Sequence, residues 1–221
     1  MSAHFPHALT ARLTDPGTFV SSLADRSESA GLARAIRVAA VLFVTALTAA
    51  AAQVSLPLPF TPVPLTLQPM IVLLGAAALG SRLGAMSQVL YLMAGIAGLP
   101  VFAASPLLPQ GAARLFGPTG GFLMSYPVAA LVVGWLAERG FDRRYLTSVL
   151  AMAAGLAVLF AWGVLWLAFT LNPAQPALAI GTALRTGFYP FILADLVKIA
   201  AAATALPGLW WLTGAGATRP R

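Results

Sequence analysis

The interval from residue 38 to residue 81 contains no charged side chain, although Arg37 and Arg82 flank it directly. The hydrocarbon core of a bilayer takes ~20 residues of α-helix per crossing, so this interval is long enough for two crossings and a short connection. The whole chain is 59% apolar and 9% charged over 221 residues, which is typical of polytopic membrane proteins. We therefore predict an all-α, multi-pass protein of the inner (plasma) membrane with six transmembrane helices.

Charged or proline-rich connections separate the expected spans. These spans cover about 36–55, 66–81, 83–103, from near 118 to 137, 145–171 and 188–212. Together they form a membrane domain, 34–214, between a flexible cytoplasmic N-terminal tail, 1–33, and a cytoplasmic C-terminal tail, 215–221. The polar start of the chain has no basic segment leading into a short apolar core, so we expect no signal peptide.

The distribution of cations sets the expected orientation, because cytoplasmic loops of membrane proteins are enriched in Lys and Arg. An even number of spans places both ends of the chain on one side, and ten arginines lie on that side. The outer loops hold only Arg114 and Arg185. We therefore expect both termini in the cytoplasm and the loop after the first span outside.

The last expected span, 188–212, carries Asp195 and Lys198, the only charged residues well inside an apolar span. A charge in hydrocarbon costs a few kcal/mol, so it persists where it is paired, faces a cavity or has a function. Residues at i and i+3 share one helix face. The pair is either an ion pair with a packing role or part of a site. Its depth, ~10–15 Å below the outer end of the span, favours an outward-opening pocket.

The connection SLPLPFTPVPLTLQP follows the first span and contains five prolines. Proline removes a backbone donor and fixes φ, so this segment is expected to be extended. An extended segment with free carbonyls does not face lipid, so it lies at the surface or over a cavity. Phe60, Thr66 and Gln68 supply the apolar and hydrogen-bonding groups that a lid needs. The alternative is an ordinary stiff loop.

The third expected span places Gln88 and Tyr91 on one face with Gly84, Gly95 and Gly98. This face is either part of a binding site or a seam where small residues let helices approach closely.

Gly120 stands near the start of the fourth span, where free backbone N–H groups suit a carboxylate, although helices commonly start this way without a ligand. An apolar, aromatic wall completes the pocket, and its candidates are Phe60, Tyr91, Phe188, Tyr189 and Phe191. A ligand with a carboxylate, an apolar stem and an amide-like head would match this pocket.

The residues that several classes of protein function require are missing from this sequence. There are no cysteines, both histidines lie in the N-terminal tail, and one intramembrane acid is too few ligands for a zinc or di-metal site. There is no phosphate-binding G-x-x-x-x-G-K-[ST] run. The net charge is +7, and the cations responsible for it flank apolar spans. This position fits membrane orientation better than nucleic-acid binding. We therefore expect no metal, no cofactor and no catalytic residue.

Three ordered blocks resemble a known family. They are PLPFTPVPLTLQPMIVLLGAAALGSRLGAMSQVLYLMAGIAGLPVFA, GPTGGFLMSYPVAA and FYPFILADLVKIAAAA, which cover about 55–135 and 187–204. Together they resemble BioY, the biotin-specific substrate-binding (S) component of energy-coupling factor (ECF) transporters.

The resemblance implies six helices and a biotin site near the outer side, beneath the first loop. It implies that Asp195 accepts an N–H of the ureido head and that Lys198 faces the valerate carboxylate. Either Gln88 or Tyr91 would be the contributing polar position on the third helix.

The resemblance also implies partners. An alanine-rich face of the first helix, here Ala46, Ala49 and Ala50, would dock on a transmembrane coupling subunit. Separate ATPase subunits would supply the energy.

Two other functions remain open from the residues themselves. The chain could be a self-sufficient ion-coupled carrier for a small carboxylate vitamin, with Asp195 as a proton site. An intramembrane enzyme with Lys198 as a Schiff-base lysine has the least support, because one acid and one lysine do not make a nucleophile, base and orienting group.

Overall fold

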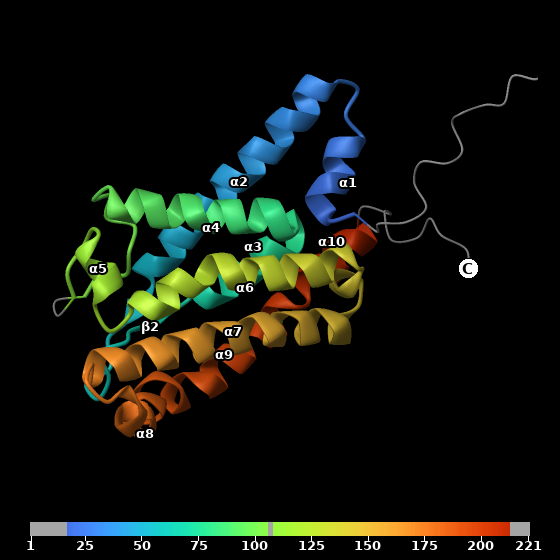
Figure 1. Ribbon diagram of the computed structural model, residues 1–221. Coiled ribbons are helices and arrows are strands. Elements are labelled where there is room, and N and C mark those ends of the chain that lie inside the picture. Colours follow the sequence, from blue (N-terminus) through green and yellow to red (C-terminus); the bar gives the residue numbers. More distant parts are fainter. Residues whose placement is uncertain (1–16, 106–107, 213–221) are drawn as a thin grey trace, which may run out of the picture.

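The computed structural model describes residues 17–105 and 108–212 and shows a bundle of helices with one short β-ribbon (Figure 1). The ribbon pairs β1 (Ser55–Leu56) with β2 (Leu65–Thr66) in antiparallel register. The helices are α1 (Phe19–Asp25), α2 (Ala30–Gln53), α3 (Gln68–Leu79), α4 (Ser81–Ile96), α5 (Ala113–Phe116), α6 (Gly120–Glu138), α7 (Tyr145–Leu171), α8 (Pro176–Gly187), α9 (Tyr189–Ala202) and α10 (Ala205–Leu212), with the 3-10 turn η1 (Phe141–Arg143). The all-α expectation is confirmed.

Four helical segments of the described chain are long and apolar enough to cross a membrane. They are Ala30–Gln53, Gly120–Glu138, Tyr145–Leu171 and Tyr189–Leu212. The expected second and third spans are shorter helices, α3 with 12 residues and α4 with 16. The glycine between them, Gly80, has φ 88°, and Gly98 has φ 93° just beyond the end of α4. Glycine adopts such angles readily and other residues rarely do, so both helices end there. The number six stays a prediction.

Helix α6 is the centre of the bundle. It lies between α4 and α7 in Figure 1 and also packs on α3. The approach to the α3–α4 turn is so close that a Cβ atom on Gly134 would overlap main-chain atoms of Gly80 and Ser81. Next to this contact, Glu138 Oε1 accepts hydrogen bonds from the Ser81 N–H at 2.7 Å and the Ser81 hydroxyl at 2.8 Å. A side chain of α6 therefore caps the otherwise unpaired N-terminus of α4.

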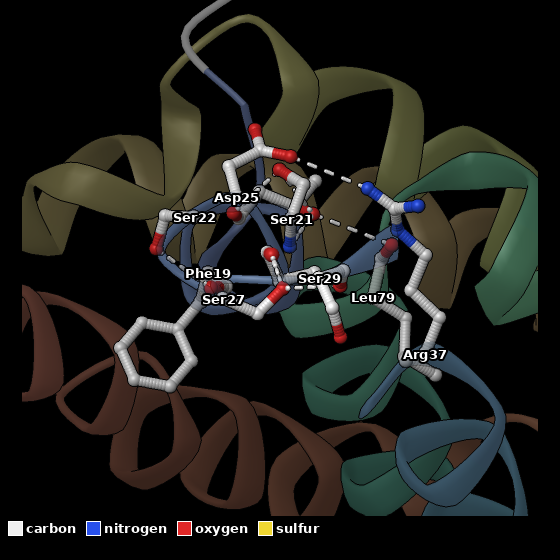
Figure 2. A network of polar contacts seen from close by, with 10 residues as sticks. Phe19, Ser21, Ser22, Asp25, Ser27, Ser29, Arg37 and Leu79 are labelled. Carbon is white, nitrogen blue, oxygen red and sulfur yellow. Dashed lines mark hydrogen bonds and ion pairs between the residues drawn. The ribbon is translucent and has the colours of Figure 1, made fainter. Parts of the chain in front are cut away.

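The segment 17–33, which the sequence places in a flexible tail, is helical for much of its length. Thr18 and Ser29 cap α1 and α2, and the buried face of α1 carries Val20 and Ala24. Figure 2 shows the polar contacts that fix α1, including the ion pair of 3.3 Å between Arg37 and Asp25. The Thr18 hydroxyl also donates to the Leu79 carbonyl at 3.3 Å. Capping residues and a small apolar face explain this order. The remaining tail expectations, 1–16 and 215–221, lie outside the described residues.

The C-terminal part of the chain contains two features that the sequence analysis did not resolve. The connection before the last span, 172–187, includes the additional helix α8. The last span itself is interrupted by a turn at Ala203 and Thr204, which separates α9 from α10. Proline occupies the first turn of α3, α8 and α9, where its missing N–H costs no helical hydrogen bond.

Candidate binding site

Asp195 and Lys198 form a short ion pair on one face of α9. Lys198 Nζ lies 2.7 Å from Asp195 Oδ1, and the side chains of Lys198 and Asp195 are only 12% and 7% exposed. The same ammonium group donates a second hydrogen bond of 2.7 Å to the main-chain oxygen of Thr66. The expected i, i+3 geometry is thus present, and Lys198 also joins α9 to the loop that enters α3.

A cavity lies beside this pair, between α9, α6, α7 and the α2–α3 loop. The volume open to the centre of a water-sized sphere is about 60 Å³. By the same measure, one water molecule needs ~10–15 Å³. Its polar lining comprises Thr66, Gln68, Arg114, Thr119, Tyr126, Asp195 and Lys198, and its apolar lining comprises Val63, Pro64, Leu65, Pro69, Ala103, Phe122, Leu123, Leu156, Leu159, Phe160 and Phe191.

The end of the proline-rich connection, the lid expected from the sequence, borders this cavity. Its last residues, from Val63 to Thr66, form part of the cavity wall. The Thr66 hydroxyl donates to Gln68 Oε1 at 3.3 Å and accepts from the Gln68 N–H at 3.3 Å. These local bonds hold the end of the lid where α3 begins, so Thr66 and Gln68 face the cavity together.

Tyr91 lies one layer behind the cavity wall. Its hydroxyl accepts a hydrogen bond of 2.6 Å from Gln68 Nε2 and donates to the Val101 carbonyl at 3.1 Å. Its ring lies 6.3 Å from that of Tyr126, which does line the cavity. Tyr91 is fully buried, so in this arrangement it orients Gln68 rather than meeting a ligand.

The other candidates from the sequence, Phe191 excepted, lie outside the cavity lining. Gln88 is buried, and its amide donates to the Thr48 hydroxyl at 3.4 Å and the Ser87 hydroxyl at 3.1 Å. These contacts fit the alternative of a packing seam between α4 and α2. Phe60 is 60% exposed. A Cβ atom on Gly120 would overlap the Leu115 carbonyl, so its smallness is needed for the approach of α5 to α6. Of the aromatic candidates, Phe191 lines the cavity.

Arg114 also lines the cavity, although the sequence indicated only that it lies in an outer loop. It is 1% exposed, its Nη2 donates to the Ala103 carbonyl at 2.7 Å, and its Nη1 donates to the Pro109 carbonyl at 3.3 Å. Its Nε has no hydrogen-bond partner among the described residues. Burial lowers the pKa of Arg114, and the hydroxyls of Tyr91 and Tyr126 act in the opposite direction. One sequence feature could have indicated a site role for Arg114: it is the single charged residue in the loop 104–118.

The charges of the cavity favour an anionic ligand with a polar head. Asp195 and Lys198 largely neutralise each other, which leaves the guanidinium of Arg114 without a carboxylate partner among the ion pairs of the described chain. A buried cation of this kind is stabilised by an anion that accepts its hydrogen bonds. The apolar side chains from α6 and α7, including Phe122, Leu159 and Phe160, suit a hydrocarbon stem.

Comparison with known proteins gives a consistent result. A model of the BioY family matches residues 24–215. The biotin transporter BioY of Thermotoga maritima is 38% identical over 159 residues, which cover 72% of this chain and 86% of that protein. The probable biotin transporter BioY of Pyrococcus horikoshii is 38% identical over 169 residues, covering 76% of this chain and 93% of that protein.

The fold is also similar to that of a solved structure. This is the crystal structure of the S-component for biotin from an ECF-type ABC transporter, with a TM-score of 0.70 and 22% identity over 83% of this chain and 94% of that chain. The resemblance seen in the sequence is thereby confirmed.

Proposed function

The chain belongs to the BioY family, and we propose that it is a biotin-binding membrane subunit that mediates biotin uptake. The observation that carries this proposal is the cavity beneath the α2–α3 loop, which combines Asp195, Lys198 and Arg114 with an apolar wall. Biotin has a ureido head that donates N–H groups, an aliphatic stem and a carboxylate. Each part has a chemically matching group in the cavity.

The ligand is proposed to lie with its ureido head at Asp195. This carboxylate accepts one hydrogen bond from Lys198 and retains further acceptor capacity for ureido N–H donors. The resemblance to the family implied Lys198 as the partner of the valerate carboxylate. Because Lys198 already bonds to Asp195 and to the Thr66 carbonyl, we assign the carboxylate to Arg114, whose Nε lacks a partner among the described residues.

The six crossings are proposed to be α2, α3, α4, α6, α7 and the segment formed by α9 and α10 together. The cytoplasmic ends would then include η1 and the α3–α4 turn, and both termini would lie in the cytoplasm. The arginines on this side support the orientation. The lid and α8 would face the outside, so the cavity would collect biotin there.

Energy is proposed to come from ECF-type transmembrane coupling and ATPase subunits. The solved structure with the similar fold is the S-component of an ECF-type ABC transporter, which supports such partners. On α2, Ala46 and Ala50 are exposed and Ala49 is partly buried. These residues leave a surface of small side chains that a partner helix can approach closely.

The alternative is a self-sufficient, ion-coupled carrier for a small carboxylate vitamin. The observation that favours it is the burial of Asp195, which is 5% exposed, because buried carboxylates in membrane proteins often take part in proton relays.

One uptake experiment separates the two mechanisms and tests the function. Biotin-auxotrophic cells without their own transporter would express the chain, with or without ECF coupling subunits. Uptake would be measured with a trace amount of radiolabelled biotin. We expect uptake that needs the coupling subunits and stops when ATP is depleted. Uptake by the chain alone that collapses with a protonophore would support the carrier, and no uptake in either case would contradict the proposed function.

A further inference from the structure

The lid is tied to α8 by a hydrogen bond between residues far apart in the sequence. The Thr61 hydroxyl donates to the main-chain oxygen of Thr186 at 2.6 Å. The same hydroxyl accepts from the Val63 N–H at 3.1 Å. Thr61 is only 8% exposed. One buried hydroxyl therefore both shapes the lid and attaches it to the bundle.

The Thr186 carbonyl needs this donor. It lies in the last turn of α8, and the residue four positions later is Pro190. Helix α8 ends at the next residue, Gly187, so this carbonyl has no helical partner, and Pro190 has no backbone N–H to offer. The end of a helix also carries partial negative charge, which favours a hydrogen-bond donor there.

The other end of the same stretch is tied to α9. Lys198 donates to the Thr66 carbonyl at 2.7 Å. Between these two attachments, Val63, Pro64 and Leu65 form part of the cavity wall. The lid is therefore fastened on both sides of the residues that cover the site, once by Lys198 and once by Thr61.

We propose that Thr61 is a positioning residue that holds the lid closed and so sets how long a ligand stays bound. The side chain of Thr61 does not line the cavity, so its effect is exerted through the lid. The effect on ligand release rests on the proposed function, whereas the effect on the lid itself does not. The fastening by Thr61 can be removed without changing Asp195, Lys198 or Arg114.

The variant Thr61→Val keeps the shape of the side chain and removes its hydroxyl. Loss of one buried hydrogen bond corresponds to roughly a tenfold change in an opening equilibrium. We therefore expect biotin to dissociate from Thr61→Val roughly tenfold faster than from the wild type. Thr61→Ser, which restores the hydroxyl, should return the rate to near the wild-type value.

Thr186→Val is the matched control. Its hydroxyl donates to the Thr182 carbonyl within α8, so the variant loses a hydroxyl of the same residue but keeps the carbonyl that Thr61 binds. Its release rate should match the wild type.

The test measures biotin release by displacement from the purified full chain, and hydrogen–deuterium exchange of peptides covering 57–66 in the ligand-free chain. Faster exchange of this segment in Thr61→Val, with rescue by Thr61→Ser, supports the fastening even if biotin is not the ligand. Wild-type exchange and wild-type release in Thr61→Val would overturn it. Absence of biotin binding by the wild type would count against the proposed function alone.

Discussion

Lys198 Nζ lies 2.7 Å from Oδ1 of Asp195, three positions earlier on the same face of α9. The ammonium group donates its second hydrogen bond to the Thr66 carbonyl, also at 2.7 Å. Lys198 thus holds the carboxylate in place and connects it to the lid. A purely structural ion pair would need no cavity beside it, whereas both residues line one here.

Removing the cation should strongly weaken biotin binding. Lys198→Met leaves the buried Asp195 carboxylate without its partner. An uncompensated buried charge is strongly unfavourable, so the carboxylate no longer stays in place to accept ureido N–H groups. We expect the Kd for biotin to rise by at least about 100-fold, as measured by equilibrium binding in detergent. Arg185→Met, which removes an exposed cation from α8, is the matched control and should bind normally. An unchanged Kd in Lys198→Met would show that the pair only packs.

The role assigned to Arg114 can be tested with a ligand that lacks the carboxylate charge. The wild type should prefer biotin to biotinamide by roughly 10- to 100-fold, because a hydrogen bond to a charged group contributes ~1.5–3 kcal/mol. Arg114→Gln should lose this preference while its affinity for biotinamide changes little. A preference that persists in Arg114→Gln but disappears in Lys198→Met would place the carboxylate at Lys198 instead.

The Asp142 carboxyl should make the stability of the chain depend on pH. Burial raises the pKa of Asp142 to about 6, although the hydrogen bond from Trp210 and the charge of Arg143 lower it. The folded chain therefore binds this proton more tightly than the unfolded chain. The resulting stabilisation is fully present below about pH 4 and is lost as the pH rises through 6, a contribution of up to ~3 kcal/mol.

The variant Asp142→Asn isolates this effect. Its amide oxygen can still accept the 2.7 Å hydrogen bond that Trp210 Nε1 donates. We expect the Tm of Asp142→Asn to vary less between pH 4 and 8 and to exceed that of the wild type at pH 8. Glu28→Gln, which neutralises an exposed carboxylate, should leave the pH profile unchanged. Identical profiles for Asp142→Asn and the wild type would contradict the assignment.

The close approach of α6 to the α3–α4 turn predicts a specific stability loss. A methyl group at Gly134 overlaps the main chain of Gly80 and Ser81, and such overpacking costs ~1–3 kcal/mol. Gly134→Ala should therefore lower the Tm in detergent. Gly208→Ala is the control, because a Cβ built there meets no atom within 4 Å outside the neighbouring backbone of its own helix. Equal Tm values for the two variants would show that the turn adapts freely.

The proposed topology can be mapped with single cysteines, because the chain has none of its own. Cysteines at Gln110 and Gln175 should react with a membrane-impermeant maleimide in intact cells. Cysteines at Glu28 and Arg144 should react only after permeabilisation. Labelling of all four in intact cells, or the reverse pattern, would contradict six crossings with cytoplasmic termini.

The parts of the site that the sequence predicted are those set by local chain geometry. The i, i+3 spacing of Asp195 and Lys198 fixes a shared face on any α-helix. The five prolines similarly fix an extended connection after the first span. Neither feature depends on which helices pack against each other.

The parts that the sequence missed depend on tertiary contacts. Arg114 is buried because α5 turns the loop back against α6, and a loop arginine is ordinarily exposed. Gln88 has the right spacing for a site residue but meets Thr48 of α2 instead. The α8 helix was hidden because its sequence, PALAIGTALRTG, is too short and too mixed to resemble a membrane span.

Calorimetric titration of the purified chain with biotin measures whether biotin occupies the cavity at Asp195. We expect one-to-one binding by the wild type that Asp195→Asn greatly weakens, since the amide replaces one of the two acceptor oxygens by an N–H donor and loses the charge that pairs with Lys198. Absence of binding by a folded, monodisperse wild-type sample, or equal binding by Asp195→Asn, would contradict it.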